Sequence, residues 1–150
     1  MPPARAARSD RFLAAVGAFA CLAVLAVAAG LSPSADGHGT HTQLGMPRCS
    51  WVVTFDKPCP TCGMTTAFAH AAGGDILASA RVQPAGAALA VGAAAAFWVL
   101  LHTAVFGSRS ARLFRPLWTP RWITAGAAGL IAAWVYKLLT WDAAAGTLPS

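Results

Sequence analysis

Three long apolar stretches constrain the fold of this chain more than any other feature of its sequence. They cover residues 12–31, 84–106 and 122–139. A transmembrane helix needs about 20 mostly apolar residues, and each stretch is close to that length. With 57% hydrophobic and 11% charged residues, the 150-residue chain has the composition of a membrane protein. We therefore expect an all-α membrane protein with three transmembrane helices.

The first apolar stretch has two interpretations. It follows three arginines and carries no charge itself, as in a signal peptide or a signal anchor. Its apolar run is longer than the roughly 7 to 15 residues of a cleavable signal peptide. Residues Ala26-Val27-Ala28 nevertheless resemble a small-residue cleavage site. The length favours an uncleaved signal anchor, and cleavage stays open as the alternative.

The positive charges predict the orientation of the chain, because cytoplasmic loops are enriched in Lys and Arg. We expect residues 1–11 and the link 107–121 on the cytoplasmic side, and the segment 32–83 and the tail 140–150 outside. The cytoplasmic cations would be Arg5, Arg8, Arg11, Arg109, Arg112, Arg115 and Arg121. This arrangement predicts a multi-pass protein of the inner cell membrane whose external segment is periplasmic or extracellular.

The net charge of +6 follows largely from these topology-setting arginines. A basic face beside a membrane most simply meets anionic lipid headgroups. The sequence has no nucleic-acid motif and no phosphate-binding loop. The expected partners are thus the lipid bilayer and, for so small a membrane chain, another membrane protein, with no nucleic acid.

The external segment 32–83 divides into short elements. Residues 32–45 are rich in Ser, Gly, Thr and His and predict a loop. Residues 51–55 are β-branched and aromatic, which predicts a short extended run. Residues 64–72 and 76–82 predict two short interfacial helices, separated by two glycines and an N-capping aspartate. Helices this short cannot span a membrane, so they should lie at its surface or against the spanning helices.

Three cysteines give the external segment its chemistry. Cys59 and Cys62 belong to the turn Cys-Pro-Thr-Cys-Gly, and Cys49 lies ten positions upstream. Such a turn is typical of zinc knuckles, in which three or four Cys and His side chains bind the metal. The loop residue His41 is the expected fourth zinc ligand, with His38 as a substitute. His70 would lie about 12 Å along a helix from Cys62 and is too distant.

The same cysteines allow two other hypotheses. Cys59 and Cys62 have the C-x-x-C spacing of thiol-disulfide oxidoreductases, although the usual βαβ context is missing. A purely structural disulfide is the third possibility, since disulfides persist in an oxidising compartment. The leading hypothesis is a metal-stabilised module that binds or scaffolds a partner, and a membrane-bound oxidoreductase is the runner-up. We find no catalytic triad, paired acids or nucleotide-binding residues, so an enzyme is the less expected outcome.

A longer pattern around the cysteine turn resembles a known family. It comprises the string Cys59-Pro60-Thr61-Cys62-Gly63-Met64-Thr65-Thr66-Ala67-Phe68 with Cys49 upstream, then Gly74-Asp75 and Gln83-Pro84. This pattern resembles the domain of unknown function 2752 family over roughly residues 39–101. The resemblance implies a small bacterial membrane protein of a few helices, with no established activity. Thr66 stands where the family commonly has Arg, and Gln83 where it commonly has Asn.

Other features have mostly structural interpretations. The run from Gly39 to Gly45 resembles what a subset of relatives carries ahead of the cysteines. Cys21, in the middle of the first stretch, is expected to be a small apolar residue, and His102 and Lys137 to be structural groups near span ends. Small residues at four-residue spacing predict close packing of the second and third spans. These residues are Ala88, Gly92 and Ala96 on one helix and Ala125, Gly129 and Ala133 on the other.

Overall fold

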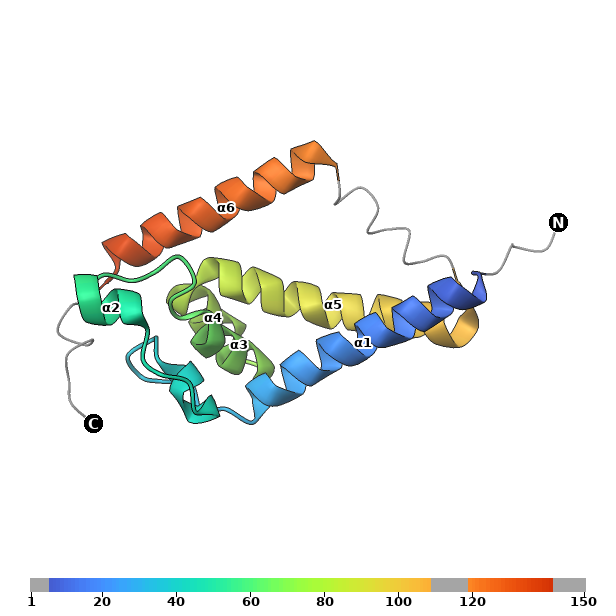
Figure 1. The fold of residues 1–150 in the computed structure, drawn as a ribbon, viewed down its shortest axis with the longest axis horizontal. Helices are drawn as coiled ribbons and strands as arrows, with labels where there is room; N and C mark the ends of the chain where they lie inside the picture. Colours follow the sequence, from blue (N-terminus) through green and yellow to red (C-terminus); the bar gives the residue numbers. More distant parts are fainter. Residues whose placement is uncertain (1–5, 109–118, 142–150) are drawn as a thin grey trace.

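The structure, a computed structural model, describes residues 6–108 and 119–141, and these residues are helical with no strand among them (Figure 1). The elements are α1 (Arg8–Ala29), the 3-10 helix η1 (Thr40–Leu44), α2 (Ser50–Phe55), α3 (Met64–Ala72), α4 (Ile76–Val82), α5 (Pro84–Phe106) and α6 (Pro120–Leu139). The expected all-α fold is confirmed.

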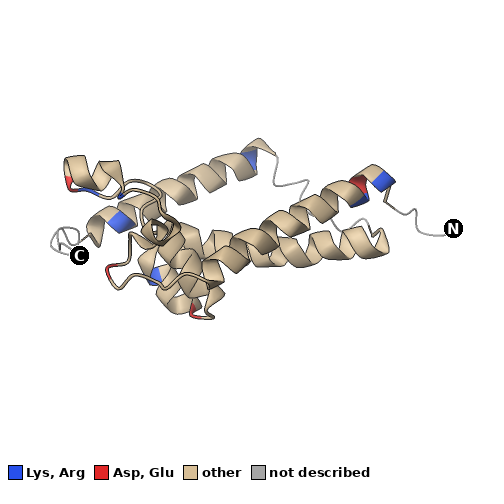
Figure 2. Ribbon diagram, turned by 60° about the horizontal axis from the view of Figure 1, so that its bottom comes forward, with Lys and Arg blue, Asp and Glu red and all other residues tan. Residues whose placement is uncertain are grey.

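Helices α1, α5 and α6 are long and apolar enough to cross a membrane, so the chain is a multi-pass membrane protein. The charged residues of the described chain gather towards the two ends of these helices, and the stretches between are almost free of charge (Figure 2). Helix α5 has the predicted bounds, whereas α1 begins at Arg8 and α6 at Pro120, slightly before the apolar stretches. Arg109, Arg112 and Arg115 lie outside the described residues.

Helices α1 and α5 form the most extensive helix pair (Figure 1). Small side chains allow them to approach closely, since Ala14 and Ala18 are buried on α1. A Cβ atom added at Gly17 would lie 3.0 Å from Cδ1 of Leu100. Arg11 also binds the last turn of α5, donating to the carbonyls of residues 104 and 105 at 3.0 and 3.1 Å. A cation suits this position because the C-terminal carbonyls of a helix lack intrahelical partners.

The two short helices predicted at residues 64–72 and 76–82 are confirmed with those bounds. They pack on each other, on α5 and, for α3, on α1 as well. The Oδ1 atom of Asp75 accepts a hydrogen bond from the Ala78 amide at 2.8 Å, so the predicted N-cap is present. The Ser79 hydroxyl donates to the Ala67 carbonyl at 2.7 Å and joins the two helices. Together they form a compact layer at one end of the α1–α5 pair.

The extended run predicted at residues 51–55 is wrong, because these residues belong to α2. A short apolar run has too few residues for its periodicity to distinguish strand from helix. β-branched and aromatic residues favour strands mainly where a neighbouring strand is available to pair with, and the described residues contain none. Asp56 ends α2 with a φ of +50°, in the left-handed region.

The predicted close packing of α5 and α6 is also wrong. Figure 1 shows α6 diverging from α5 towards its first residues, and residues 121–132 are all exposed. A Cβ atom added at Gly92 or Gly129 would meet nothing within 4 Å. The small residues of α5 and α6 follow from an alanine-rich composition. Helix α5 instead packs on α1, α3 and α4.

Candidate functional site

The cysteine turn leads directly into α3. The amide of Cys62 donates to the Cys59 carbonyl at 3.0 Å, which closes a four-residue turn. Such a turn brings its first and last Cα atoms within about 7 Å, and a disulfide requires about 4.4 to 6.8 Å. Gly63 follows with a φ of +84°, and α3 begins at Met64. The two thiols are therefore close neighbours at the start of a helix.

Cys59 is the more accessible thiol of the pair. It is half-buried, and its Sγ atom lies 3.4 Å from the Thr61 hydroxyl oxygen. Burial alone would raise the pKa of Cys59. Hydrogen bonds from the Thr61 side chain and backbone and from the Cys49 thiol outweigh that effect and hold the pKa below its ordinary value. Cys59 thus has enhanced thiolate character, and Cys49 lies beside it.

Cys62 has the opposite environment. Only 7% of its surface is exposed. Burial, with a smaller contribution from the neighbouring Cys59, raises the pKa of Cys62 to about 11, and the positive charge of Lys137 opposes this rise only in part. The two thiols of one turn therefore differ in both access and acidity. All four cysteines of the chain are free thiols.

Lys137, predicted to be a structural group near a span end, is buried beside this turn. Its side chain is 7% exposed, and its Nζ atom donates to the carbonyls of Gly37 and Val82 at 3.1 and 3.2 Å. A Cβ atom added at Gly63 would lie 3.3 Å from that Nζ atom. Lys137 therefore connects the C-terminal end of α6 to the loop and to the last residue of α4, next to the cysteine turn.

A cavity of about 630 Å³ lies between the loop and α2 and holds several of the predicted metal ligands in its lining. Cys49, Cys62 and His41 line it together, and so does His38. The Nε2 atom of His41 is 3.2 Å from the Pro47 carbonyl oxygen. Three Cys and one His suit zinc chemically. Within residues 6–108 and 119–141, however, no three His, Cys, Asp or Glu side chains are arranged to hold one metal ion.

Of the remaining candidates from the sequence, His70, Cys21 and His102 lie elsewhere, whereas His38 lines the cavity. His70 is on α3 and Cys21 is on α1, and neither lines this cavity. His38 faces Trp141 with ring centroids 4.7 Å apart, and its Nδ1 atom is 2.9 Å from the Asp36 carbonyl oxygen. His102 lies near the end of α5, with its Nδ1 atom 2.9 Å from the Ser108 hydroxyl.

Two further residues hold the turn, and the sequence predicted this role for neither: Trp134 was not singled out, and Gln83 was noted only as a departure from the family pattern. The Nε1 atom of Trp134 donates to the Pro58 carbonyl at 3.0 Å, and the Nε2 atom of Gln83 donates to the Pro60 carbonyl at 3.2 Å. Trp134 and Lys137 share one face of α6 at a spacing of three residues, and Trp141 follows just after the helix ends. These polar and aromatic side chains are unusual in an otherwise apolar span, and they were the sequence signal that could have indicated a contact with the turn.

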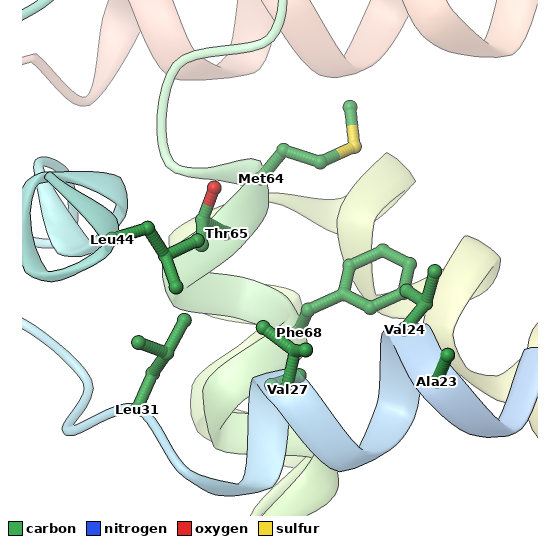
Figure 3. A pocket seen from close by; sticks show the side chains of 9 residues that line it. Ala23, Val24, Val27, Leu31, Leu44, Met64, Thr65 and Phe68 are labelled. Carbon is green, nitrogen blue, oxygen red and sulfur yellow. The ribbon is translucent and has the colours of Figure 1, made fainter. Parts of the chain in front are cut away.

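A second cavity, of about 410 Å³, lies between α1, η1 and α3. Leu31 and Leu44 lie on one side of it and Val27 and Phe68 on the other (Figure 3). Thr65 supplies the one side-chain hydroxyl in its lining, and no ionisable group lines it. This cavity is therefore apolar and lacks the thiol chemistry of the cysteine turn.

Comparison with known proteins finds a family match that includes the cysteine turn. Residues 49–107 match the family described as protein of unknown function (DUF2752). Over this stretch the chain is similar to the DUF2752 family. The match begins at Cys49 and ends just after α5, so the family predicted from the residue pattern is confirmed. The run from Gly39 to Gly45 lies outside the DUF2752 match, and its resemblance stays a prediction. No curated protein and no solved structure matches the chain.

Proposed function

We propose that this membrane protein exchanges thiols and disulfides, with Cys59 as the attacking thiol and Cys62 as the resolving thiol. The observation that carries the proposal is the difference between the two thiols within one hydrogen-bonded turn. Cys59 is half-buried with a lowered pKa, whereas Cys62 is buried with a pKa raised to about 11. Dithiol enzymes use an accessible, acidic thiol to attack and a second thiol to resolve the mixed disulfide.

The reaction partner is a disulfide of another protein. The Cys59 thiolate attacks one partner sulfur, which forms a mixed disulfide and releases the other partner sulfur as a thiolate. Cys62 then gives its proton to that thiolate or to water, and its sulfur bonds to Cys59 while the second partner sulfur leaves and takes up a proton. Two electrons pass to the partner: its disulfide becomes two thiols, and Cys59 and Cys62 become a disulfide. The reverse sequence oxidises a partner dithiol.

The proposed orientation places this turn on the outer side of the inner cell membrane. Arg8, Arg11 and Arg121 lie in the first turns of α1 and α6, and Arg11 contacts the last turn of α5, whereas the short helices lie at the opposite end of the α1–α5 pair (Figure 1). Positively charged ends favour the cytoplasmic side. An outer location supports the exchange reaction, because disulfides persist in an oxidising compartment.

A second candidate function is the metal-stabilised module, which would hold zinc through Cys49, Cys59, Cys62 and His41 and bind or scaffold a partner. Its support is the shared cavity of Cys49, Cys62 and His41, together with the contact between Cys49 and Cys59. The chemistry of this donor set fits zinc. The arrangement of the described ligands supports it less well than it supports exchange.

Trapping a mixed disulfide tests the exchange proposal. The protein, purified in mild detergent, is treated with oxidised glutathione and analysed by intact mass. Cys62→Ser should accumulate one glutathione on Cys59, whereas the wild type should release it and form the Cys59–Cys62 disulfide. Cys21→Ser is the matched control and should behave as the wild type, because Cys21 lies on α1 away from the turn.

The same preparation separates the alternatives. Near-stoichiometric zinc, with thiols that react only after chelation, would favour the metal-stabilised module and contradict exchange. A Cys59–Cys62 disulfide that never reacts with glutathione in either direction would indicate a structural disulfide. If zinc is bound, His41→Ala should weaken its retention.

A further inference from the structure

The backbone on both sides of Cys59 is held by side chains from two other helices. Cys59 lies between Pro58 and Pro60, and a proline has no N–H group, so only its carbonyl can form a backbone hydrogen bond. Both carbonyls are occupied: Trp134 donates to Pro58 at 3.0 Å, and Gln83 donates to Pro60 at 3.2 Å. Two side-chain hydrogen bonds from outside the turn thus fix the backbone on either side of Cys59.

The hydrogen bonds to the Pro58 and Pro60 carbonyls involve buried residues. Pro58 and Gln83 are fully buried, and the Oε1 atom of Gln83 has no hydrogen-bond partner. The Pro60 carbonyl can only accept, so the amide nitrogen of Gln83 must face it. Gln83 precedes α5 as its N-cap residue, and Trp134 lies in α6. Two candidate spanning helices therefore hold the segment that carries the proposed attacking thiol.

We propose that Gln83 and Trp134 are positioning residues that hold the Cys59 turn in its dithiol form and thereby raise the reduction potential of the Cys59–Cys62 pair. This inference rests on the proposed exchange function. Both bonds are present while the cysteines are free thiols. In this proposal, formation of the Cys59–Cys62 bond shifts the backbone between the two cysteines and so weakens the hydrogen bonds to the carbonyls of Pro58 and Pro60. A dithiol form that is selectively stabilised makes the pair more oxidising.

The test is an equilibrium between the protein and glutathione. One oxidised glutathione converts the Cys59–Cys62 dithiol to a disulfide and leaves two reduced glutathione molecules, so thiols and electrons balance. The full chain in mild detergent, with Cys21→Ser in every variant, is equilibrated at a series of glutathione ratios. Acid quenching and a mass-tagging alkylating reagent then give the fraction of dithiol at each ratio.

Trp134→Phe keeps an aromatic ring but loses the indole N–H, and Gln83→Met keeps the side-chain length but loses the amide. Each should increase the equilibrium constant for disulfide formation about threefold to tenfold, as expected for loss of one hydrogen bond from the dithiol form. A tenfold change corresponds to about 30 mV towards more negative potential for a two-electron couple.

Two control variants lose a comparable hydrogen bond without touching the turn. Tyr136→Phe removes the bond from α6 to the Arg81 carbonyl, of 3.0 Å. Ser79→Ala removes the buried bond to the Ala67 carbonyl, of 2.7 Å. Both should leave the glutathione equilibrium unchanged even if they lower stability. This separates an effect on the dithiol pair from general weakening of the fold.

The outcomes distinguish a failure of the positioning role from a failure of the exchange function. An unchanged equilibrium constant in Trp134→Phe and Gln83→Met, in a protein that does form the disulfide, overturns the positioning role alone. An equal shift in Tyr136→Phe and Ser79→Ala also overturns it, because the effect would then be general. A wild type that forms no Cys59–Cys62 disulfide at any glutathione ratio overturns the exchange function and the positioning role together.

Discussion

Helices α1 and α6 are both long and apolar, yet they join the rest of the protein in different ways. Helix α1 packs along α5 through small side chains, as at Gly17, where an added Cβ would lie 3.0 Å from Leu100. Helix α6 is exposed throughout residues 121–132 and is attached near its C-terminal end by hydrogen bonds from Trp134, Tyr136 and Lys137 to backbone carbonyls. Length and hydropathy identify a span, whereas neighbouring side chains decide how it is held.

The attachment of α6 through Lys137 is expected to be most sensitive to a substitution at Gly63. An alanine there would have its Cβ 2.7 Å from the Gly37 carbonyl oxygen and 3.3 Å from Nζ of Lys137, at a φ of +84°. The left-handed backbone and the close approach should together lower the free energy of unfolding by about 2 to 4 kcal/mol. Thermal unfolding in mild detergent measures this loss.

Gly74 provides the matched control for Gly63. Its φ is +88°, but an added Cβ would meet nothing within 4 Å. Gly74→Ala should therefore show only the cost of the left-handed backbone, about 1 to 2 kcal/mol. Equal losses in the two variants would mean that the approach of Gly63 to Gly37 and Lys137 has no energetic importance.

The apolar packing is expected to be most sensitive at Gly86. An added Cβ would lie 2.8 Å from Cβ of Ala67, where α5 meets α3. Gly86→Ala should lower the free energy of unfolding by about 1 to 3 kcal/mol through overpacking. Gly92→Ala, on the same helix with nothing within 4 Å, should be neutral or slightly stabilising. The same loss at both positions in a chemical unfolding titration would contradict the packing described for α5.

Lys137→Met tests how far one side chain attaches α6. It removes the hydrogen bonds to the Gly37 and Val82 carbonyls while keeping an apolar side chain of similar length. We expect a loss of about 1 to 2 kcal/mol, together with faster protease cleavage of the loop around Gly37. Tyr136→Phe, which loses one exposed hydrogen bond, should have the smaller effect on both measurements. Equal cleavage rates in wild type and Lys137→Met would show that Lys137 is not what holds the loop.

The smallest expected effect is a pH dependence at the two thiols. The lowered pKa of Cys59 predicts that iodoacetamide modifies it first near neutral pH, whereas Cys62 should resist until the pH approaches about 11. For Cys62 the unfolded value is 9.0, so the folded protein binds the proton more tightly. Its contribution to stability is complete below pH 9.0 and is lost as the pH rises towards about 11.

Intact-mass analysis of the alkylated protein and unfolding curves at several pH values check both statements. Cys62→Ala should remove that component of the stability loss above pH 9.0. Modification of Cys62 before Cys59 would contradict the described burial.

Most of the fold could be predicted from the sequence because its signals are local. The bounds of α3, α4 and α5 follow from glycine, aspartate and proline at their ends, and each of these elements lies where the prediction placed it. The prediction failed at α2, whose six residues carry too little periodicity, and at the contact between α5 and α6. An alanine-rich chain offers small-residue patterns on many helix faces, so spacing alone could not identify the face that packs.

The candidate site was only partly predictable. The spacing of Cys49, Cys59 and Cys62 indicated thiol chemistry, but their relative burial depends on residues far along the chain. Trp134 and Lys137 reach the turn from α6, and Gln83 from the start of α5. Contacts at such separations are set by how helices dock, and a single sequence contains no direct record of that docking.

The bond from Trp134 to the Pro58 carbonyl also sets an order of events during synthesis. Its two residues are separated by 76 positions, and the donor belongs to the last helix of the described chain. Because a chain is made from its N-terminus, the cysteines exist for some time before the helix that holds them has emerged. The cysteine turn of the nascent protein therefore lacks this hydrogen bond until α6 has been made.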